Sequence, residues 1–234
     1  MLKEILIFDC DGVLVDSEII AERVLSECLD AWLPDLHAEA ELRQVLGMTT
    51  AAILDKLARR SVHDLPQDAQ GHIERTIDAR LATDLQAIER VAETIEGLEM
   101  PLAIVSNSGR QRVKISLECT GLSRVLARAL GEVPLFTAEQ VARPKPDPAV
   151  YQLAARTLGY APEDCLVVED SVSGVTAAHG AGMTVIGFIG ASHIEPGHDQ
   201  RLEQAGAWQI MSNMQELASL VKRWREQRGP VAKA

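Results

Sequence analysis

Asp9 and Asp11 are the first residues in this sequence whose types and spacing could do chemistry. They directly follow the apolar run 5–8, whose length is typical of a buried strand. Because side chains alternate along an extended chain, the two carboxylates can lie on one side while Cys10 points away. Packing explains such an acidic pair poorly. It indicates a metal ligand, a proton donor or a nucleophile.

Three further polar groups could join this pair. Two of them end apolar, strand-like runs, and the third is a lysine between prolines, which restrict the backbone and predict an extended chain there. Because parallel strands end at the same edge of a sheet, groups far apart in the sequence can meet at that edge. The three groups are Ser106 with Asn107, Glu169 with Asp170, and Lys145 within 143–148.

Acids at two strand ends, one lysine and one hydroxyl are suited to phosphoryl transfer. Magnesium prefers oxygen ligands, which Asp9 and Asp170 supply. A carboxylate can also attack phosphorus and form an aspartyl-phosphate, which divides one difficult step into two. A metal and Lys145 would together neutralise the phosphoryl oxygens. We therefore expect Mg²⁺ as cofactor and a small phosphorylated metabolite as substrate.

The pattern of elements predicts an α/β fold, a doubly wound parallel sheet with an inserted, all-helical cap domain. Only helical periodicity occurs between Ser17 and about Ile95, whereas strand and helix alternate from Pro101 onward. We expect a discontinuous core at 1–16 and 96–228 and a cap at 17–95. Strands are predicted at 5–8, 102–106, 165–168, 184–188 and 208–211, and 125–130 is open between strand and helix.

Composition narrows the function further. The formal charge of −11 argues against nucleic acid as a partner. No apolar run is long enough to span a membrane, and no secretory signal is recognised at the start, so we expect a cytoplasmic protein. A monomer is the default expectation. The four cysteines are scattered and are interpreted as reduced thiols. The six histidines show no ligand spacing and are interpreted as surface or structural residues: His37, His63, His72, His179, His193 and His198.

Four segments of the sequence resemble one known family. They are FDCDGVLVDSE at 8–18, VSNS at 105–108, RPKPDPAVY at 143–151 and VVEDSVSGVTAAHGAGM at 167–183. In this order and spacing they resemble the haloacid dehalogenase-like superfamily, in the helical-cap branch near β-phosphoglucomutase and small sugar-phosphate phosphatases. The resemblance covers essentially the whole chain, and the cap insertion falls where this branch carries it.

The resemblance implies roles for the acidic residues. Asp9 would be the nucleophile and a magnesium ligand. Asp11 would protonate the leaving alcohol and then activate water, and its backbone carbonyl would also bind the metal. Asp170 would be the third protein ligand, with Glu169 in the first coordination shell or just outside it.

The resemblance also implies how the substrate is bound. Ser106 would hold a phosphoryl oxygen with the Asn107 amide nearby, and Lys145 would bridge the nucleophile and the phosphoryl group. One loop of the cap is expected to face the active site and to influence specificity. That loop consists of Gly47, Met48, Thr49 and Thr50.

The reaction subtype follows from what the sequence has and lacks. The resemblance implies that carbon–halogen chemistry is disfavoured, because the dehalogenases of this superfamily lack the aspartate present here as Asp11. It also implies that phosphonate cleavage is disfavoured, because that reaction needs a cap lysine and the one cap lysine, Lys56, lies in a helical pattern. In the β-phosphoglucomutases that the chain resembles, a histidine occurs early in the first cap helix, near Ala21 here, and an arginine follows the glycine of a cap loop, here Gly47. Both residues are missing from this sequence, which disfavours a mutase. We therefore expect a phosphatase acting on a sugar phosphate or sugar-acid phosphate.

The alternatives are a β-phosphoglucomutase-like phosphomutase and a non-catalytic protein that binds phosphorylated metabolites. A binding protein would not require nucleophile and acid together, and the residues that weigh against it are Asp9, Asp11, Lys145 and Asp170.

Overall fold

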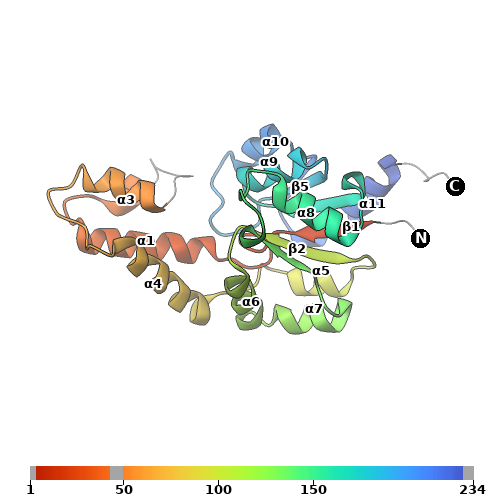
Figure 1. Ribbon diagram of the computed structural model, residues 1–234, viewed down its shortest axis with the longest axis horizontal. Helices are drawn as coiled ribbons and strands as arrows, with labels where there is room; N and C mark the ends of the chain where they lie inside the picture. Colours follow the sequence, from red (N-terminus) through yellow and green to blue (C-terminus); the bar gives the residue numbers. More distant parts are fainter. Residues whose placement is uncertain (1–3, 43–49, 229–234) are drawn as a thin grey trace. The chain divides into compact units, whose positions relative to one another are not determined.

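The computed structural model describes residues 4–42 and 50–228, which form two compact units, Met1–Asp16 with Gln86–Ala234, and Ser17–Leu85 (Figure 1). The larger unit contains a six-stranded sheet of order β3-β2-β1-β4-β5-β6, and all of its pairings are parallel. This confirms the predicted doubly wound α/β core. The strands are β1 (Ile5–Phe8), β2 (Leu102–Ser106), β3 (Leu135–Thr137), β4 (Cys165–Glu169), β5 (Thr184–Phe188) and β6 (Gln209–Met211).

Helices cover both faces of this sheet. Side chains of α8 (Ala149–Leu158), α9 (Val172–Gly180) and α10 (His198–Ala205) pack with alternate strand residues in one buried cluster. Figure 1 shows α5 (Val91–Glu96), α6 (Arg110–Cys119) and α7 (Leu122–Leu130) on the opposite side. Because β1 is enclosed from both faces, all four of its residues are buried, which explains its uninterrupted apolar run. The remaining elements of this unit are η1 (Ala138–Gln140), η2 (Pro162–Asp164), η3 (Met214–Glu216) and α11 (Leu217–Arg228).

The smaller unit is helical throughout its described residues. Its longest helices, α1 (Glu18–Trp32) and α4 (Ala69–Asp84), contact one another, and α1 buries the stripe Ile20, Val24, Cys28 and Leu29. This spacing of apolar residues is the helical periodicity seen in the sequence. The other helices are α2 (Ala38–Leu42) and α3 (Thr50–Ala58). In the part of the chain that the structure describes, no helix is long and apolar enough to cross a membrane.

The smaller unit ends at Leu85, ten residues before the boundary expected from the sequence. Residues 86–95 belong to the larger unit because their backbone pairs with the segment after β1, where Ile88 N donates to Leu14 O at 3.0 Å. Helix α5 then buries its apolar side in the core of that unit. Helical periodicity runs through the boundary, so the pattern alone could not locate it.

The segment 125–130, open between strand and helix, is part of helix α7. Its alanine, leucine and arginine residues favour a helix. The strand that the sequence did not reveal is β3, which has three residues, lies at the edge of the sheet and pairs with β2 alone. So short a run carries too little periodicity to be recognised.

The loop around Lys145 is a turn, and the prediction of an extended chain there is wrong. Asp147 N donates to Pro144 O at 2.9 Å, and the peptide bond between Lys145 and Pro146 is cis. The turn leads directly into α8. The lysine and the first turn of this helix are therefore parts of one short segment.

Candidate active site

The structure brings the predicted strand-end residues together at the carboxyl edge of the sheet. β1 lies between β2 and β4, so Asp9, Ser106 and Glu169 follow or end neighbouring parallel strands. Asp9, Glu169 and Asp170 each offer a carboxylate oxygen, and these three atoms lie within 4.8 Å of one another. All three residues are buried. The larger unit therefore contains a concentrated negative charge withdrawn from water.

Lys145 lies inside this acidic cluster. Its Nζ donates to Asp9 Oδ1 at 2.7 Å, to Glu169 Oε1 at 2.6 Å and to the Val105 carbonyl at 3.0 Å. An ammonium group has three N–H donors, so these acceptors satisfy all of them. Burial acts to lower the pKa of Lys145, but the charges of Asp9 and Glu169 raise this pKa overall. The lysine is therefore a fixed positive charge beside the candidate nucleophile.

The surroundings of Asp9 raise the pKa of its carboxyl group. Burial raises the pKa of Asp9 well above its usual value of 3.8, Lys145 acts to lower it, and Glu169 and Asp170 raise it further. A buried carboxylate is stable in its charged form only when a cation is close. The cluster thus has the charge and the oxygen donors that suit a divalent cation.

Glu169 is held by groups of the protein on both of its oxygens. Oε1 accepts from Lys145 Nζ and, at 2.7 Å, from the Tyr151 hydroxyl, while Oε2 accepts from Ser171 Oγ at 3.1 Å. The Lys145 Nζ also lies 5.0 Å from the centroid of the Tyr151 ring. Burial and the charge of Glu169 raise the pKa of Tyr151, which therefore remains a donor. Sequence reasoning missed Tyr151, because its position on α8 is that of an ordinary core residue.

The close packing around Glu169 predicts that Gly174→Ala destabilises the protein. A Cβ at Gly174 on α9 would lie 1.9 Å from Glu169 Oε1, so the carboxylate must move. Alanine normally favours a helix by about 1 kcal/mol over glycine, but overpacking should reverse this to a loss of about 1–3 kcal/mol. Urea unfolding measures the change. The matched control is Gly180→Ala on the same helix, whose Cβ would be 3.8 Å from Pro148. Equal stability of the two variants would contradict the prediction.

Two histidines contact Asp170, whereas all six histidines were interpreted from the sequence as surface or structural residues. His193 Nε2 lies 3.2 Å from Asp170 Oδ2, and His198 Nε2 donates to the Asp170 carbonyl at 2.5 Å. Burial lowers the pKa of His198. His193 lies in the loop after β5 and His198 is the first residue of α10, so both follow the carboxyl end of β5, which lies at the same edge of the sheet. Their approach depends on this topology, which histidine spacing in the sequence does not show.

Asp11 accepts hydrogen bonds from two serine hydroxyl groups at the end of β2. Asp11 Oδ2 lies 2.7 Å from Ser108 Oγ and 3.3 Å from Ser106 Oγ, and Ser108 N donates to Ser106 Oγ at 2.9 Å. Sequence reasoning named Ser106 and missed Ser108 as a site residue. Ser106 ends β2 and Ser108 lies two positions further on, so the alternation that placed Asp9 beside Asp11 could have found this pair as well.

The Asn107 side chain binds the lysine loop. Its Oδ1 accepts from Lys145 N at 3.0 Å and its Nδ2 donates to Lys145 O at 3.3 Å. The side-chain amide therefore holds the backbone of Lys145 in place through two hydrogen bonds. That the Asn107 amide lies near a bound phosphoryl group stays a prediction.

Gly12 allows the chain after Asp11 to turn against Asp170. Its φ is +74°, and a Cβ at this position would lie 2.0 Å from Asp170 Oδ2. Glycine alone accepts both the left-handed backbone and the close approach.

Cys10 is fully buried, and burial followed by the charge of Asp11 raises the pKa of its thiol well above the usual value.

The cap loop expected to influence specificity falls mostly outside the described residues. Gly47, Met48 and Thr49 are not described, and Thr50 is the first residue of α3. Their relation to the substrate stays a prediction.

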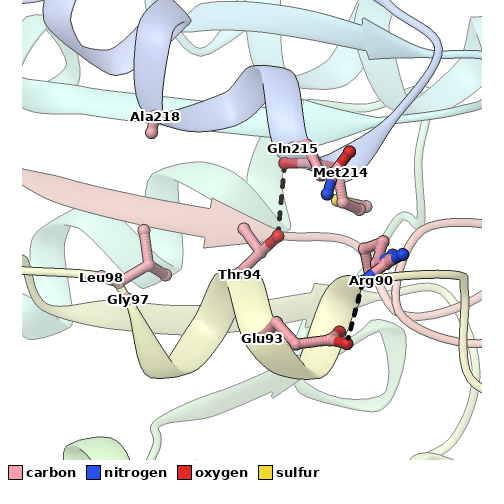
Figure 2. Close-up of a pocket in the computed structure, with 8 residues that line it drawn as sticks. All are labelled: Arg90, Glu93, Thr94, Gly97, Leu98, Met214, Gln215 and Ala218. Carbon is pink, nitrogen blue, oxygen red and sulfur yellow. Dashed lines mark hydrogen bonds and ion pairs between the residues drawn. The ribbon is translucent and has the colours of Figure 1, made fainter.

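A hollow with a cavity volume of about 290 Å³ lies elsewhere in the larger unit, between α5 and the segment of η3 and α11 (Figure 2). Thr94 Oγ1 donates to Met214 O across it at 3.3 Å, and Arg90 lies 3.6 Å from Glu93. None of the predicted site residues lines this hollow. Its charged groups already pair with one another, so the acidic cluster remains the candidate site.

The fold and the site together define an α/β enzyme with a carboxylate–lysine centre at the carboxyl edge of a doubly wound sheet. Residues 6–188 match the model of the haloacid dehalogenase-like hydrolase family. The chain belongs to this family, which confirms the resemblance seen in the sequence.

Known relatives show how far the similarity extends. The chain is 29% identical over 194 residues to 6-phosphogluconate phosphatase of Escherichia coli (strain K12), covering 82% of this chain and 86% of that protein. It is 32% identical over 188 residues to hexitol phosphatase A of the same organism, covering 77% and 80%. Among solved structures, a haloacid dehalogenase-like protein of unknown function from Agrobacterium tumefaciens has a TM-score of 0.84 at 36% identity, covering 95% of this chain and 99% of that one.

Proposed function

We propose that this protein is a magnesium-dependent phosphatase that hydrolyses a phosphate monoester of a sugar or sugar acid through an aspartyl-phosphate. The observation that carries this proposal is the buried contact of 2.7 Å between Asp9 and Lys145 inside the acidic cluster. A nucleophilic carboxylate needs a fixed cation nearby, because charge develops on the phosphoryl oxygens as they transfer.

In the first half of the reaction, an Asp9 carboxylate oxygen attacks phosphorus and the bond from phosphorus to the ester oxygen breaks. Protonated Asp11 gives its proton to the departing alcohol oxygen, which avoids an alkoxide leaving group. Lys145 offsets the phosphoryl charge, and its three hydrogen bonds fix it in place. Ser106 Oγ and the Asn107 backbone N–H orient the phosphoryl oxygens in this proposal.

In the second half, Asp11 accepts a proton from water while the water oxygen attacks the phosphorus of the aspartyl-phosphate. The bond between phosphorus and Asp9 breaks, releasing inorganic phosphate and restoring the carboxylate. One residue thus serves as acid and then as base, because each half-reaction leaves Asp11 in the protonation state that the other requires.

The residues present fit a magnesium ion. The oxygen donors of Asp9 and Asp170 and the Asp11 backbone carbonyl would hold it, since Mg²⁺ binds through one or two carboxylates plus substrate phosphate. When bound, the ion supplies positive charge to the phosphoryl oxygens. Glu169 already accepts from Lys145, Tyr151 and Ser171, so we assign it to positioning the lysine more than to the metal.

The substrate class rests on the relatives, which act on phosphogluconate and hexitol phosphates according to their names. Two such proteins, each matching more than three quarters of this chain, favour a phosphorylated polyhydroxy compound. The core residues described above recognise the phosphoryl group, which all of these compounds share.

The proposal predicts that phosphate is released from 6-phosphogluconate or a hexose 6-phosphate only with Mg²⁺, and that EDTA abolishes the release. Rates of phosphate release with Mg²⁺, with EDTA and after Mg²⁺ is restored measure this. The control is Asp55→Asn, an exposed residue of the smaller unit, which should keep full activity. No release from folded protein across a panel of phosphorylated sugars, sugar acids and an aryl phosphate would overturn the proposal.

A further inference from the structure

Ser108 contacts the candidate acid–base residue more closely than Ser106 does. Its Oγ lies 2.7 Å from Asp11 Oδ2, compared with 3.3 Å for Ser106 Oγ. Ser108 is half-buried and its backbone N–H donates to Ser106 Oγ, so the two serines and Asp11 form one local network. No role in the mechanism proposed above uses the Ser108 hydroxyl.

The two serines differ in what substrate binding would do to them. Ser106 Oγ is assigned to a phosphoryl oxygen, and a hydroxyl has one proton to donate, so Ser106 must give up its contact with Asp11 to bind the phosphoryl group. Ser108 then keeps the shorter of the two contacts. Its hydroxyl donates to Asp11 Oδ2 and is assigned no contact with the phosphoryl group.

We propose that Ser108 is a positioning residue that fixes the rotation of the Asp11 carboxyl group for proton transfer to the leaving alcohol. This inference rests on the proposed phosphatase function. Because Asp11 Oδ2 accepts a hydrogen bond from the Ser108 hydroxyl, Asp11 Oδ1 is the oxygen that carries the proton. In the step concerned, the Oδ1–H bond breaks and a proton bonds to the ester oxygen as its bond to phosphorus breaks. Without Ser108 the carboxyl group rotates more freely, and fewer substrate complexes have the proton directed at the leaving oxygen.

The dependence on the leaving group tests this role. A sugar alkoxide leaves poorly without a proton, whereas p-nitrophenolate leaves readily without one. For Ser108→Ala we expect kcat/KM to fall by about tenfold for the sugar phosphate, a part of the 10²–10⁴-fold that a general acid contributes. For p-nitrophenyl phosphate we expect a fall of less than about twofold, because kcat/KM reports the first half-reaction, which needs no acid with this leaving group.

Two variants complete the experiment. Ser108→Thr keeps a hydroxyl and should recover most of the kcat/KM for the sugar phosphate. Ser123→Ala on α7 is the matched control and should leave kcat/KM for both substrates unchanged. If Ser108→Ala fails to fold, Ser108→Cys, whose thiol is a weak donor, gives the same comparison. Equal losses for both substrates, or no loss for either, would overturn the inference while leaving the phosphatase intact. A wild-type protein inactive on both substrates would instead overturn the proposed function and this inference with it.

Discussion

Asp9→Asn is expected to lower kcat for any phosphate monoester by about 10⁴-fold or more, as removal of a catalytic nucleophile does in other enzymes. The amide has nearly the shape of the carboxylate but is a poor nucleophile, so no aspartyl-phosphate can form. Its oxygen can still accept from Lys145, which keeps a second anionic partner in Glu169. The fold should therefore survive the loss of activity.

Steady-state rates and an acid quench of enzyme mixed with substrate measure the two parts of this prediction. The wild-type protein should carry a phosphoryl group after the quench, detected by mass spectrometry of the peptide that contains Asp9, and the variant should not. Asp164→Asn at the opposite end of β4 serves as the control for an aspartate-to-asparagine change. A variant that retains a tenth of wild-type activity would show that Asp9 is not the nucleophile.

The variant should also separate chemistry from folding. Asparagine removes one negative charge from a cluster in which burial raises the pKa of Asp9. The free energy of unfolding of the variant should therefore lie within about 2 kcal/mol of the wild-type value, which is the range of most substitutions. A much larger loss, measured by urea unfolding, would mean that Asp9 is a structural residue whose removal disrupts the site.

The sequence was sufficient for the central part of the fold. Strands β1, β2 and β4 are fully buried runs, and β5 is buried in all but its first residue. Such runs, bounded by turns or polar clusters, can be recognised without tertiary context. Parallel alternation then places their carboxyl ends on one edge. For this reason the meeting of Asp9, Ser106 and Glu169 could be predicted although 160 residues separate the first from the last.

What the sequence could not supply are contacts made by residues of ordinary type. Tyr151 reads as a core aromatic residue, yet its hydroxyl contacts Glu169 at 2.7 Å. His193 and His198 reach Asp170 only because β5 lies next to β4. A single residue in an apolar helix or a connection has no periodic partner in the sequence. Its role depends on packing, which the pattern does not encode.

Lys145→Met is expected to lower the free energy of unfolding by about 3–5 kcal/mol near pH 8, the usual cost of leaving buried charges without their partner. Methionine has a similar unbranched shape, so the loss should come from charge more than from packing. Asp9 and Glu169 would both lose the ammonium group that they share, with Asp170 close by. Activity should fall as well, because the fixed cation beside the phosphoryl group is gone.

The loss of stability should depend on pH in one direction. The pKa of Asp9 in the folded protein is already above its ordinary value of 3.8, and Lys145 is the one charge that acts to lower it. In the variant this pKa rises further, so the folded state binds a proton more readily than the unfolded chain does. Stability from that proton is present below the ordinary pKa and is lost as the pH rises through the raised one. The variant should thus be closer to wild type at pH 5.5 than at pH 8.

Urea unfolding at the two pH values, with EDTA present, measures this difference, and Lys114→Met on the exposed side of α6 is the control. Adding Mg²⁺ at pH 8 should restore part of the lost stability, because a cation bound by Asp9 and Asp170 offsets the charge that Lys145 supplied. Equal losses at pH 5.5 and pH 8, with no response to Mg²⁺, would mean that the charge of Lys145 is not what stabilises the protein. A loss that shrinks with acid and with metal would instead show that the lysine and the metal share one task, which is to keep a buried nucleophile charged.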